Sequence, residues 1–486
     1  MSRTLDAVVV GAGPNGLAAA IVLAEAGRSV AVVEARETIG GSCRTAELTL
    51  PGFRHDVCSA IHPMAVASPF FARIPLERHG LRWIHPKAPL AHPLDDGSAA
   101  LLHRSVEATG ATLGTDASAW AAFVDPFLDD ADALFAGILR PMRVPRHPLA
   151  LARFGVSALR SAAGVVNARF RGERARALFG GCAGHSILPL DKTASAAIGL
   201  VLAIAGHSHG WPCAAGGSQS IADALAARLR ELGGTLETGR EVRSLADLPG
   251  AHAVLFDVAP RALERIAGEA LPVRYRAALR AFRHGPGVFK VDWALAGPIP
   301  WTARECERAG VVHVGGTMEE IADSERAAWS ATPAERPFVL VAQPSLFDPT
   351  RAPAGRHVVW GYCHVPNGCT VDMTTRIEAQ IERFAPGFRD RIRARVTTDP
   401  ARFAAYDANY VGGDISGGAN TLFRIFARPV ARLVPCATPD PSLFLCSSST
   451  PPGAGVHGIC GWFAAKVALR RVFGRRIARL PTVEEA

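Results

Sequence analysis

Lysine, long apolar runs and paired cysteines are what this chain has little of. Lysine occurs only at Lys87, Lys192, Lys290 and Lys466, so arginine supplies nearly all of the positive charge in a chain of net charge +9. The apolar run at residues 193–206 is shorter than the ~20 residues that a transmembrane helix needs. The ten cysteines include no CxxC pair, which favours buried thiols in a reducing compartment. We therefore expect a soluble or peripheral protein in the cytoplasm.

Arginine is concentrated in two segments. Residues 140–176 contain nine arginines against one acid, Glu173. The second group is Arg470, Arg471, Arg475, Arg476 and Arg479. Aromatic residues do not interleave with the arginines and no nucleic-acid motif accompanies them, so we expect no nucleic-acid partner. The amphipathic part, residues 149–170, indicates a lid or a peripheral contact with an anionic membrane, with an ordinary solvated helix as the alternative.

The strongest motif is a glycine turn near the N-terminus. Residues 8–20 read as a buried strand, the turn GAGPNG and the start of a helix. Gly11 closes the turn, Gly13 lets the backbone approach a pyrophosphate, and Gly16 lets the helix pack on the strand. The N–H groups and the dipole of that helix favour phosphate.

A second strand, residues 29–33, ends on Glu34, where a carboxylate would accept hydrogen bonds from ribose hydroxyls. Strand, turn, helix, strand and acid in this order predict a dinucleotide site. The glycine pair Gly40-Gly41 and Arg44 follow. A nicotinamide dehydrogenase has no general need for a second glycine turn, whereas an extended FAD suits one. With this pairing the sequence resembles the FAD-dependent amine oxidase and phytoene desaturase superfamily.

A second strong motif lies near the C-terminus. Residues 443–458 read as a strand and a Pro-Gly turn, and a helix follows to about residue 472. The helix start would direct its positive end at the turn, where it would stabilise the negative charge of a reduced flavin near N1 and O2. His457 in this turn is the best catalytic candidate, because it could orient the cofactor or accept a proton. A structural histidine that caps the turn is the alternative.

Residues 206–212, 410–419 and 447–453 extend the resemblance to the phytoene desaturase-like group, over nearly the whole chain. The resemblance implies an α/β fold: a Rossmann-like FAD-binding domain of the amine-oxidase type with an inserted α+β substrate domain on a mixed sheet. We assign residues 1–75, 210–275 and 425–486 to the FAD-binding domain. Residues 76–209 and 276–424 are assigned to the substrate domain.

The motifs and the resemblance together predict a set of cofactor-binding residues, and Val242 is placed among them at the adenine end by the resemblance alone. The set is Gly11, Gly13, Pro14, Asn15, Gly16, Glu34, Ala35, Arg36, Gly40, Gly41, Ser42, Arg44, Val242, Ser448, Gly453, Gly455 and Val456. The pair His207 and His209 has no third ligand nearby, so no metal site is expected.

Outside these motifs, residues 115–139, 193–205 and 376–384 read as helices. Strands of a second sheet are expected at residues 288–295, 338–343 and 358–364. In the first of these strands Phe289, Val291, Trp293 and Leu295 alternate with Lys290, Asp292 and Ala294. The alternation predicts one wet face and one face that lines a cavity.

The resemblance implies dehydrogenation of a hydrophobic, isoprenoid-like substrate by hydride transfer to flavin N5, with oxygen or a quinone as acceptor. A disulfide mechanism is not expected, because Cys43 has Leu48, not a second thiol, five residues on. Three alternatives stay open: an amine or small-molecule oxidase, a redox-neutral isomerase and a non-catalytic flavin-binding partner protein. The oligomeric state is also open.

Overall fold

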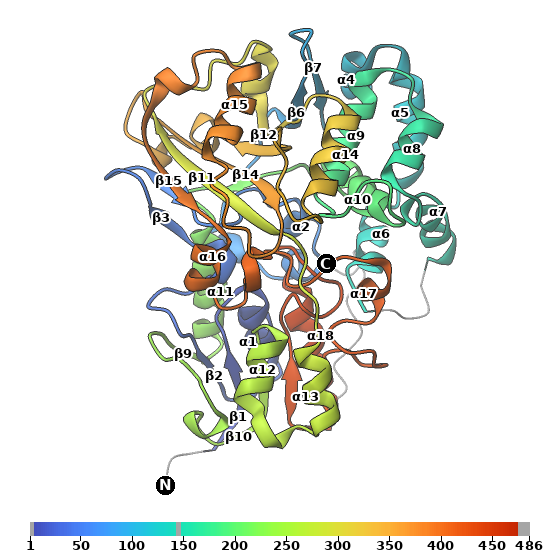
Figure 1. Ribbon diagram of the computed structural model, residues 1–486. Helices are drawn as coiled ribbons and strands as arrows, with labels where there is room; N and C mark the ends of the chain where they lie inside the picture. Colours follow the sequence, from blue (N-terminus) through green and yellow to red (C-terminus); the bar gives the residue numbers. More distant parts are fainter. Residues whose placement is uncertain (1–3, 142–146, 475–486) are drawn as a thin grey trace.

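Two large sheets organise the molecule, one in each half (Figure 1). The computed structural model describes residues 4–141 and 147–474. The five-stranded sheet is entirely parallel and the seven-stranded sheet is mixed. The predicted fold class, a Rossmann-like α/β domain combined with a mixed sheet, is confirmed.

The parallel sheet has the strand order β16-β10-β1-β2-β9. Its strands are β1 (Leu5–Val10), β2 (Val30–Val33), β9 (Thr235–Glu237), β10 (Ala251–Phe256) and β16 (Leu443–Leu445). All of them come from the three segments assigned to the cofactor domain, whose boundaries stay a prediction. The edge strand β9 is short and ends at Glu237.

Side chains of this sheet alternate between two helical layers, as the period of a strand requires. Ala7 and Val9 pack under one layer, and Val8 and Val10 pack under the other. The first layer consists of α1 (Pro14–Glu25), α11 (Gln219–Glu231) and α18 (Ile459–Arg471). The second consists of α12 (Pro260–Ala267) and α13 (Val273–Arg280).

The mixed sheet has the order β15-β11-β14-β13-β12-β6-β7. Its strands are β6 (Ala88–Pro93), β7 (Ala99–Leu102), β11 (Gly287–Leu295), β12 (Ala309–Val314), β13 (Val339–Ala342), β14 (His357–Val365) and β15 (Ile392–Thr398). Helix α15 (Thr374–Phe384) covers one face through Ile377, Ile381 and Phe384. The strands expected around β11, β13 and β14 are present.

The prediction of a wet face on β11 is wrong. Lys290 is 2% exposed and Asp292 is fully buried, where they bond to each other. A hairpin of β3 (Thr45–Glu47) and β4 (Arg54–Asp56) accounts for this burial, because its His55 lies 3.5 Å from Asp292. The apolar face does not line a cavity either, since Val291 and Trp293 pack in the core under α15.

Most of the remaining helices lie in the upper half of the view in Figure 1, around the mixed sheet. They are α2 (Pro63–Val66), α3 (Pro69–Ala72), α4 (Val106–Leu113), α5 (Ala117–Val124), α6 (Ala131–Ile138), α7 (Pro148–Ala158), α8 (Ala162–Arg169), α9 (Glu173–Gly184), α10 (Ser195–Ser208), α14 (Met318–Ala327), α16 (Pro400–Tyr406) and α17 (Leu422–Phe426). Two further strands, β5 (Trp83–Ile84) and β8 (Cys213–Ala214), form a short antiparallel pair.

The basic segment 149–170 is a bent pair of helices, α7 and α8, that meet at 93°. In the described part of the chain no single helix is long and apolar enough to cross a membrane. The two helices of the bent pair together have the length and the composition of a membrane span. Leu149 and Val156 on α7 are exposed. Membrane contact stays a prediction. Five of the arginines noted above, Arg143, Arg146, Arg475, Arg476 and Arg479, lie outside the described residues.

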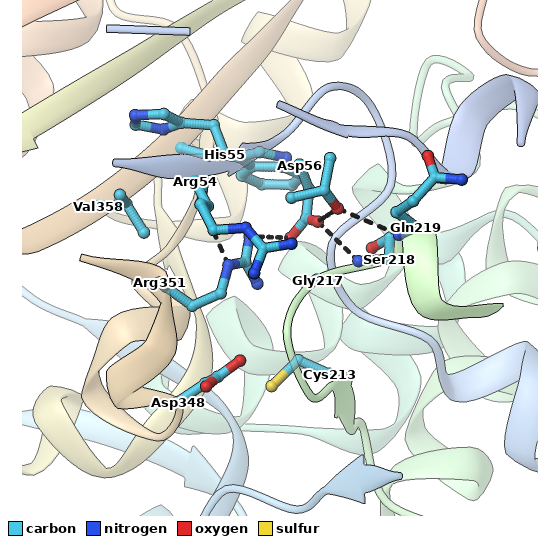
Figure 2. Close-up of polar contacts among 12 residues, drawn as sticks. Arg54, His55, Asp56, Cys213, Gly217, Ser218, Gln219, Asp348, Arg351 and Val358 are labelled. Carbon is cyan, nitrogen blue, oxygen red and sulfur yellow. Dashed lines mark hydrogen bonds and ion pairs between the residues drawn. The ribbon is translucent and has the colours of Figure 1, made fainter. Parts of the chain in front are cut away.

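A buried ion pair joins the β3–β4 hairpin to the loop that carries Arg351, between β13 and β14 (Figure 2). Asp56 accepts a hydrogen bond from Arg351 at 2.7 Å, and Arg351 also donates to the Arg54 carbonyl. The backbone N–H of Ser218 and the hydroxyl of Thr45 donate to the other Asp56 oxygen. Burial alone would raise the pKa of Asp56, but the charge of Arg351 and these hydrogen bonds lower it overall.

Removal of Arg351 is expected to be costly, because it leaves a buried carboxylate without its counter-charge. Arg351→Met should lower the free energy of unfolding by about 3–5 kcal/mol, measured by urea denaturation at pH 7. The control is Arg326→Met, which breaks the exposed pair with Asp323 and should cost at most about 1 kcal/mol. Equal effects of the two substitutions would contradict this role. Because the folded pKa of Asp56 is lowered, the stabilisation is present near neutral pH and is lost as the pH falls through that pKa.

Candidate active site

One cavity of about 910 Å³ lies at the carboxyl ends of the parallel strands. Gly11 follows β1, Glu34 follows β2, Asp257 follows β10 and Ser447 lies two residues beyond β16, and all four residues line it. Ligands of open parallel sheets bind at this edge. All predicted cofactor residues except Gly16, Gly40 and Gly453 line the cavity.

The glycine turn has no room for side chains. Gly11 has a φ of +101°, and a Cβ there would lie 2.8 Å from the carbonyl oxygen of Asp257. A Cβ on Gly13 would lie 2.7 Å from the Asp257 carboxylate, and one on Gly16 would lie 2.0 Å from the Gly11 carbonyl oxygen. Gly16 therefore serves the packing of α1, as expected, even though it does not face the cavity.

At one end of the cavity Glu34 holds two loops together. Its carboxylate accepts hydrogen bonds from the backbone N–H of Ala12 at 2.8 Å and of Arg36 at 3.0 Å. Arg44 forms a buried ion pair with it at 3.1 Å. Arg36 donates a hydrogen bond to the backbone carbonyl oxygen of Tyr406, and the guanidinium of Arg44 lies over the Tyr406 ring. Val242 lines the same cavity, and its place beside an adenine stays a prediction.

Asp257 was not predicted from the sequence. Its carboxylate accepts a hydrogen bond from the Gly16 N–H at 2.8 Å, at the point where α1 offers its positive end. Burial raises the pKa of Asp257 to about 7, and the charges of Asp407 and Glu34 add to the shift. An acid that directly follows a buried parallel strand was the available signal.

The C-terminal turn lines the same cavity as the glycine turn near the N-terminus. Ser447, Ser448, Pro452, Gly455 and Val456 line it. The turn is held there because α18 packs closely against α1. A Cβ on Gly461 would lie only 1.8 Å from the carbonyl oxygen of Asn15. The side-chain oxygen of Asn15, at the same junction, is buried without a partner among the described residues.

His457 lies in this turn but does not line the cavity. It is fully buried, its Nδ1 accepts a hydrogen bond from the N–H of Ile459, and its Nε2 lies 3.2 Å from the Gly453 carbonyl. These contacts define a neutral ring with the proton on Nε2. Burial lowers its pKa to about 4. The geometry favours the structural alternative over a catalytic role.

The other end of the cavity is an apolar chamber. Its walls come from α6, α7, α10 and the mixed sheet, and include Ile138, Leu139, Phe154, Ile198, Val201, Leu202, Trp211, Val311, Leu340, Trp360 and Tyr362. The acidic residues that line the cavity, Glu34, Glu241, Asp257 and Asp407, all belong to the other end. The arrangement suits a polar dinucleotide next to an apolar molecule.

The pair His207 and His209 does not line the cavity, and burial lowers the pKa of both rings. His207 accepts a hydrogen bond from the Trp120 ring, whereas His209 pairs with Asp132, so the two histidines do not converge. Burial raises the pKa of Cys43, and it raises the pKa of the cavity-lining Cys58 to about 11. Protonated thiols do not exchange with disulfides.

The fold is a Rossmann-like α/β domain combined with a mixed sheet, and its architecture is similar to that of solved amine oxidases. Residues 9–73 match the family model described as an NAD(P)-binding Rossmann-like domain.

The chain is homologous over nearly its full length to the mouse protein named pyridine nucleotide-disulfide oxidoreductase domain-containing protein 2. The two are 26% identical across 96% of this chain and 93% of the mouse protein. A component of the limonene dehydrogenase of Castellaniella defragrans is 37% identical over 105 residues, which is 22% of this chain and 19% of that protein. The solved structure of putrescine oxidase bound to putrescine has a TM-score of 0.62 at 18% identity, covering 97% of this chain and all of the other.

If His457 is structural, its loss is expected to weaken the fold. His457→Ala removes two buried hydrogen-bond contacts and should lower the free energy of unfolding by about 1–3 kcal/mol in urea at pH 7.5. Because the folded pKa is lowered to about 4, the wild-type contribution is full above pH ~6.5 and declines towards pH 4, so the variant should show a weaker pH dependence. His252→Ala, at an exposed position of β10, is the control. An unchanged unfolding curve for His457→Ala would contradict the structural role.

Proposed function

We propose that the protein is an FAD-dependent oxidoreductase that dehydrogenates a hydrophobic, isoprenoid-like substrate. One observation carries the proposal: a single cavity joins the glycine turn, the Glu34 carboxylate, the C-terminal turn and an apolar chamber. FAD is long enough to need both turns, and its ring would then lie where the chamber begins. The cavity volume is within the range of ~300–1,000 Å³ that is usual for ligand sites.

The residues of the site fit FAD. The glycine turn would offer backbone N–H groups at the start of α1 to the diphosphate, and Glu34 would accept hydrogen bonds from the ribose. Ser448 and Val456 would hold the ring end, below the positive end of α18. FAD supplies a hydride acceptor when bound.

The protein's own contribution is positioning and exclusion of water. The walls formed by Val201, Leu340 and Trp360 would hold an apolar molecule against the C-terminal turn, and such placement alone accounts for much of the catalysis in reactions of this kind. We propose oxygen or a quinone as the acceptor, since the chain has one glycine-turn motif and no second nucleotide domain is expected for NAD(P)H.

The second candidate function is amine oxidation. The similarity in fold to putrescine oxidase favours it, while the partial match to the limonene dehydrogenase component favours an isoprenoid. The chamber favours the apolar substrate over a charged amine. Among the described residues, all acidic side chains that line the cavity lie at the dinucleotide end, so none would pair with an ammonium group in the chamber. Anaerobic bleaching of the flavin by a panel of isoprenoids, fatty acyl compounds and amines separates the two functions. Bleaching by amines alone would contradict the isoprenoid proposal.

The purified protein is expected to be yellow with noncovalently bound FAD, and Gly13→Val should empty it. The new side chain would strike Asp257 and block the diphosphate, which should weaken FAD binding at least tenfold, or about 1.4 kcal/mol. The matched control is Gly155→Val, because no neighbour lies within 4 Å of a Cβ at that position on α7. FAD content after gel filtration is the measurement. A colourless wild-type protein that takes up no FAD would overturn the proposal.

FAD affinity should also depend on pH through Asp257. Its carboxyl loses its proton as the pH rises through about 7, and the resulting anion would repel the diphosphate beside it. We expect the dissociation constant of FAD to rise between pH 6 and 8, about tenfold for each unit by which bound FAD raises the pKa of Asp257. Asp257→Asn should flatten this dependence, and Asp223→Asn on the exposed side of α11 should leave it intact. Titration of the apoprotein with FAD measures it, and identical profiles for the wild type and Asp257→Asn would argue against this role.

A further inference from the structure

Arg428 is a buried cation that no carboxylate neutralises. Only 2% of it is exposed, and in the described part of the chain no acidic group lies within ion-pair distance of its guanidinium. The acid that interacts with it through space, Asp414, already accepts hydrogen bonds from His284, Gly285 and Ser416. The charge of Arg428 is therefore available to something else.

Neutral groups hold the guanidinium in place. One terminal nitrogen donates to the carbonyl oxygens of Ser416, Gly417 and Ser448, at 3.2, 2.9 and 2.9 Å. The other donates to the side-chain oxygen of Asn420 at 3.3 Å. The Nε–H group is buried without a partner among the described residues. Burial lowers the pKa of Arg428, but a guanidinium stays charged in proteins.

The position of Arg428 suggests what its charge serves. Arg428 lines the cavity with Asn420, Ser448 and Pro452. One of its terminal nitrogens would lie 3.0 Å from a Cβ on Gly453, so the guanidinium packs against the C-terminal turn. The same turn faces the positive end of α18, which begins at Ile459. A full positive charge and a helix start thus converge on the ring end of the proposed FAD site.

We propose that Arg428 stabilises the negative charge that the flavin ring gains on reduction, and so raises the reduction potential of the bound FAD. The inference rests on the proposed function. A hydride from the substrate brings two electrons and one proton to the ring, which leaves one net negative charge on its pyrimidine part. A buried cation next to that charge favours the reduced form, because little solvent screens the interaction.

The test is the midpoint potential of FAD in the purified holoprotein, measured by dye equilibration during anaerobic reduction. Arg428→Met removes the charge, and Arg428→Lys retains a positive charge. Asn420→Asp places a carboxylate against the guanidinium with almost no change in shape, so it keeps the test available if Arg428→Met does not fold. Asn167→Asp on the surface of α8 adds the same charge elsewhere and is the matched control.

We expect Arg428→Met and Asn420→Asp to shift the reduction equilibrium at least tenfold towards oxidised flavin, which is about 30 mV for a two-electron couple. Arg428→Lys should shift it less, and Asn167→Asp should leave it unchanged. Sulfite binding provides a second readout, because the covalent adduct of sulfite at flavin N5 also leaves the ring anionic. The dissociation constant of sulfite should therefore rise at least tenfold in Arg428→Met and Asn420→Asp.

FAD-loaded variants with the wild-type potential would overturn this inference and leave the proposed function intact. An equal shift in Arg428→Lys and Arg428→Met would also overturn it, since the loss of hydrogen bonds rather than of charge would then be the cause. Wild-type protein that takes up no FAD would instead overturn the proposed function, and this inference with it.

Discussion

The close contact between α1 and α18 is the constraint on which the site depends. The two helices belong to opposite ends of the chain, and Gly461 lets the backbone of one approach the backbone of the other at Asn15. Each helix begins at a turn that lines the same cavity, so this contact brings the two turns together. Their positive ends therefore face one space, where they favour an anionic ligand.

Charge is distributed unevenly along that space. The glycine-turn end has Glu34, Asp257 and Asp407 together with Arg36 and Arg44. The chamber end is built mainly of aliphatic and aromatic side chains, with His185 packed against Trp211. Arg428 lies near the boundary between them, by the C-terminal turn. A charged nucleotide and an apolar reactant would thus be separated by the cavity itself, with a cation close to where they would meet. This division of charge supports the proposed removal of hydride from a hydrophobic molecule.

The β3–β4 hairpin links the cofactor half to the mixed sheet. It begins directly after Arg44, a residue of the glycine-turn end, and reaches Asp292 through His55 and Arg351 through Asp56. The residues that the hairpin joins are some 240 to 300 positions apart in the chain. The buried contacts of His55 with Asp292 and of Asp56 with Arg351 therefore fix the hairpin, and with it the glycine-turn end, against the mixed-sheet half.

Local patterns predicted the cofactor half well. A strand, a glycine turn and a helix encode their own geometry within some twenty residues, and Glu34 has a fixed place relative to them. Asp257 was missed although it directly follows the buried strand β10. Arg428 could not be placed from local patterns, because the loop before β16 reaches the cavity only through the tertiary fold.

The alternation in β11 was misleading for a related reason. Lys290 and Asp292 have the spacing of a solvent-facing row, but the β3–β4 hairpin covers them and they neutralise each other. His457 was singled out for its position in the turn. Its hydrogen bonds to Gly453 and Ile459, which no sequence pattern shows, occupy the ring within the turn.

The most direct measurement is a crystal structure of the purified protein incubated with FAD. We expect electron density for the adenosine between Glu34 and Val242, for the diphosphate over the glycine turn, and for the flavin ring between the C-terminal turn and the chamber, within reach of Arg428. Density for the ring at the Glu34 end, or a cavity without FAD at saturating concentration, would contradict it.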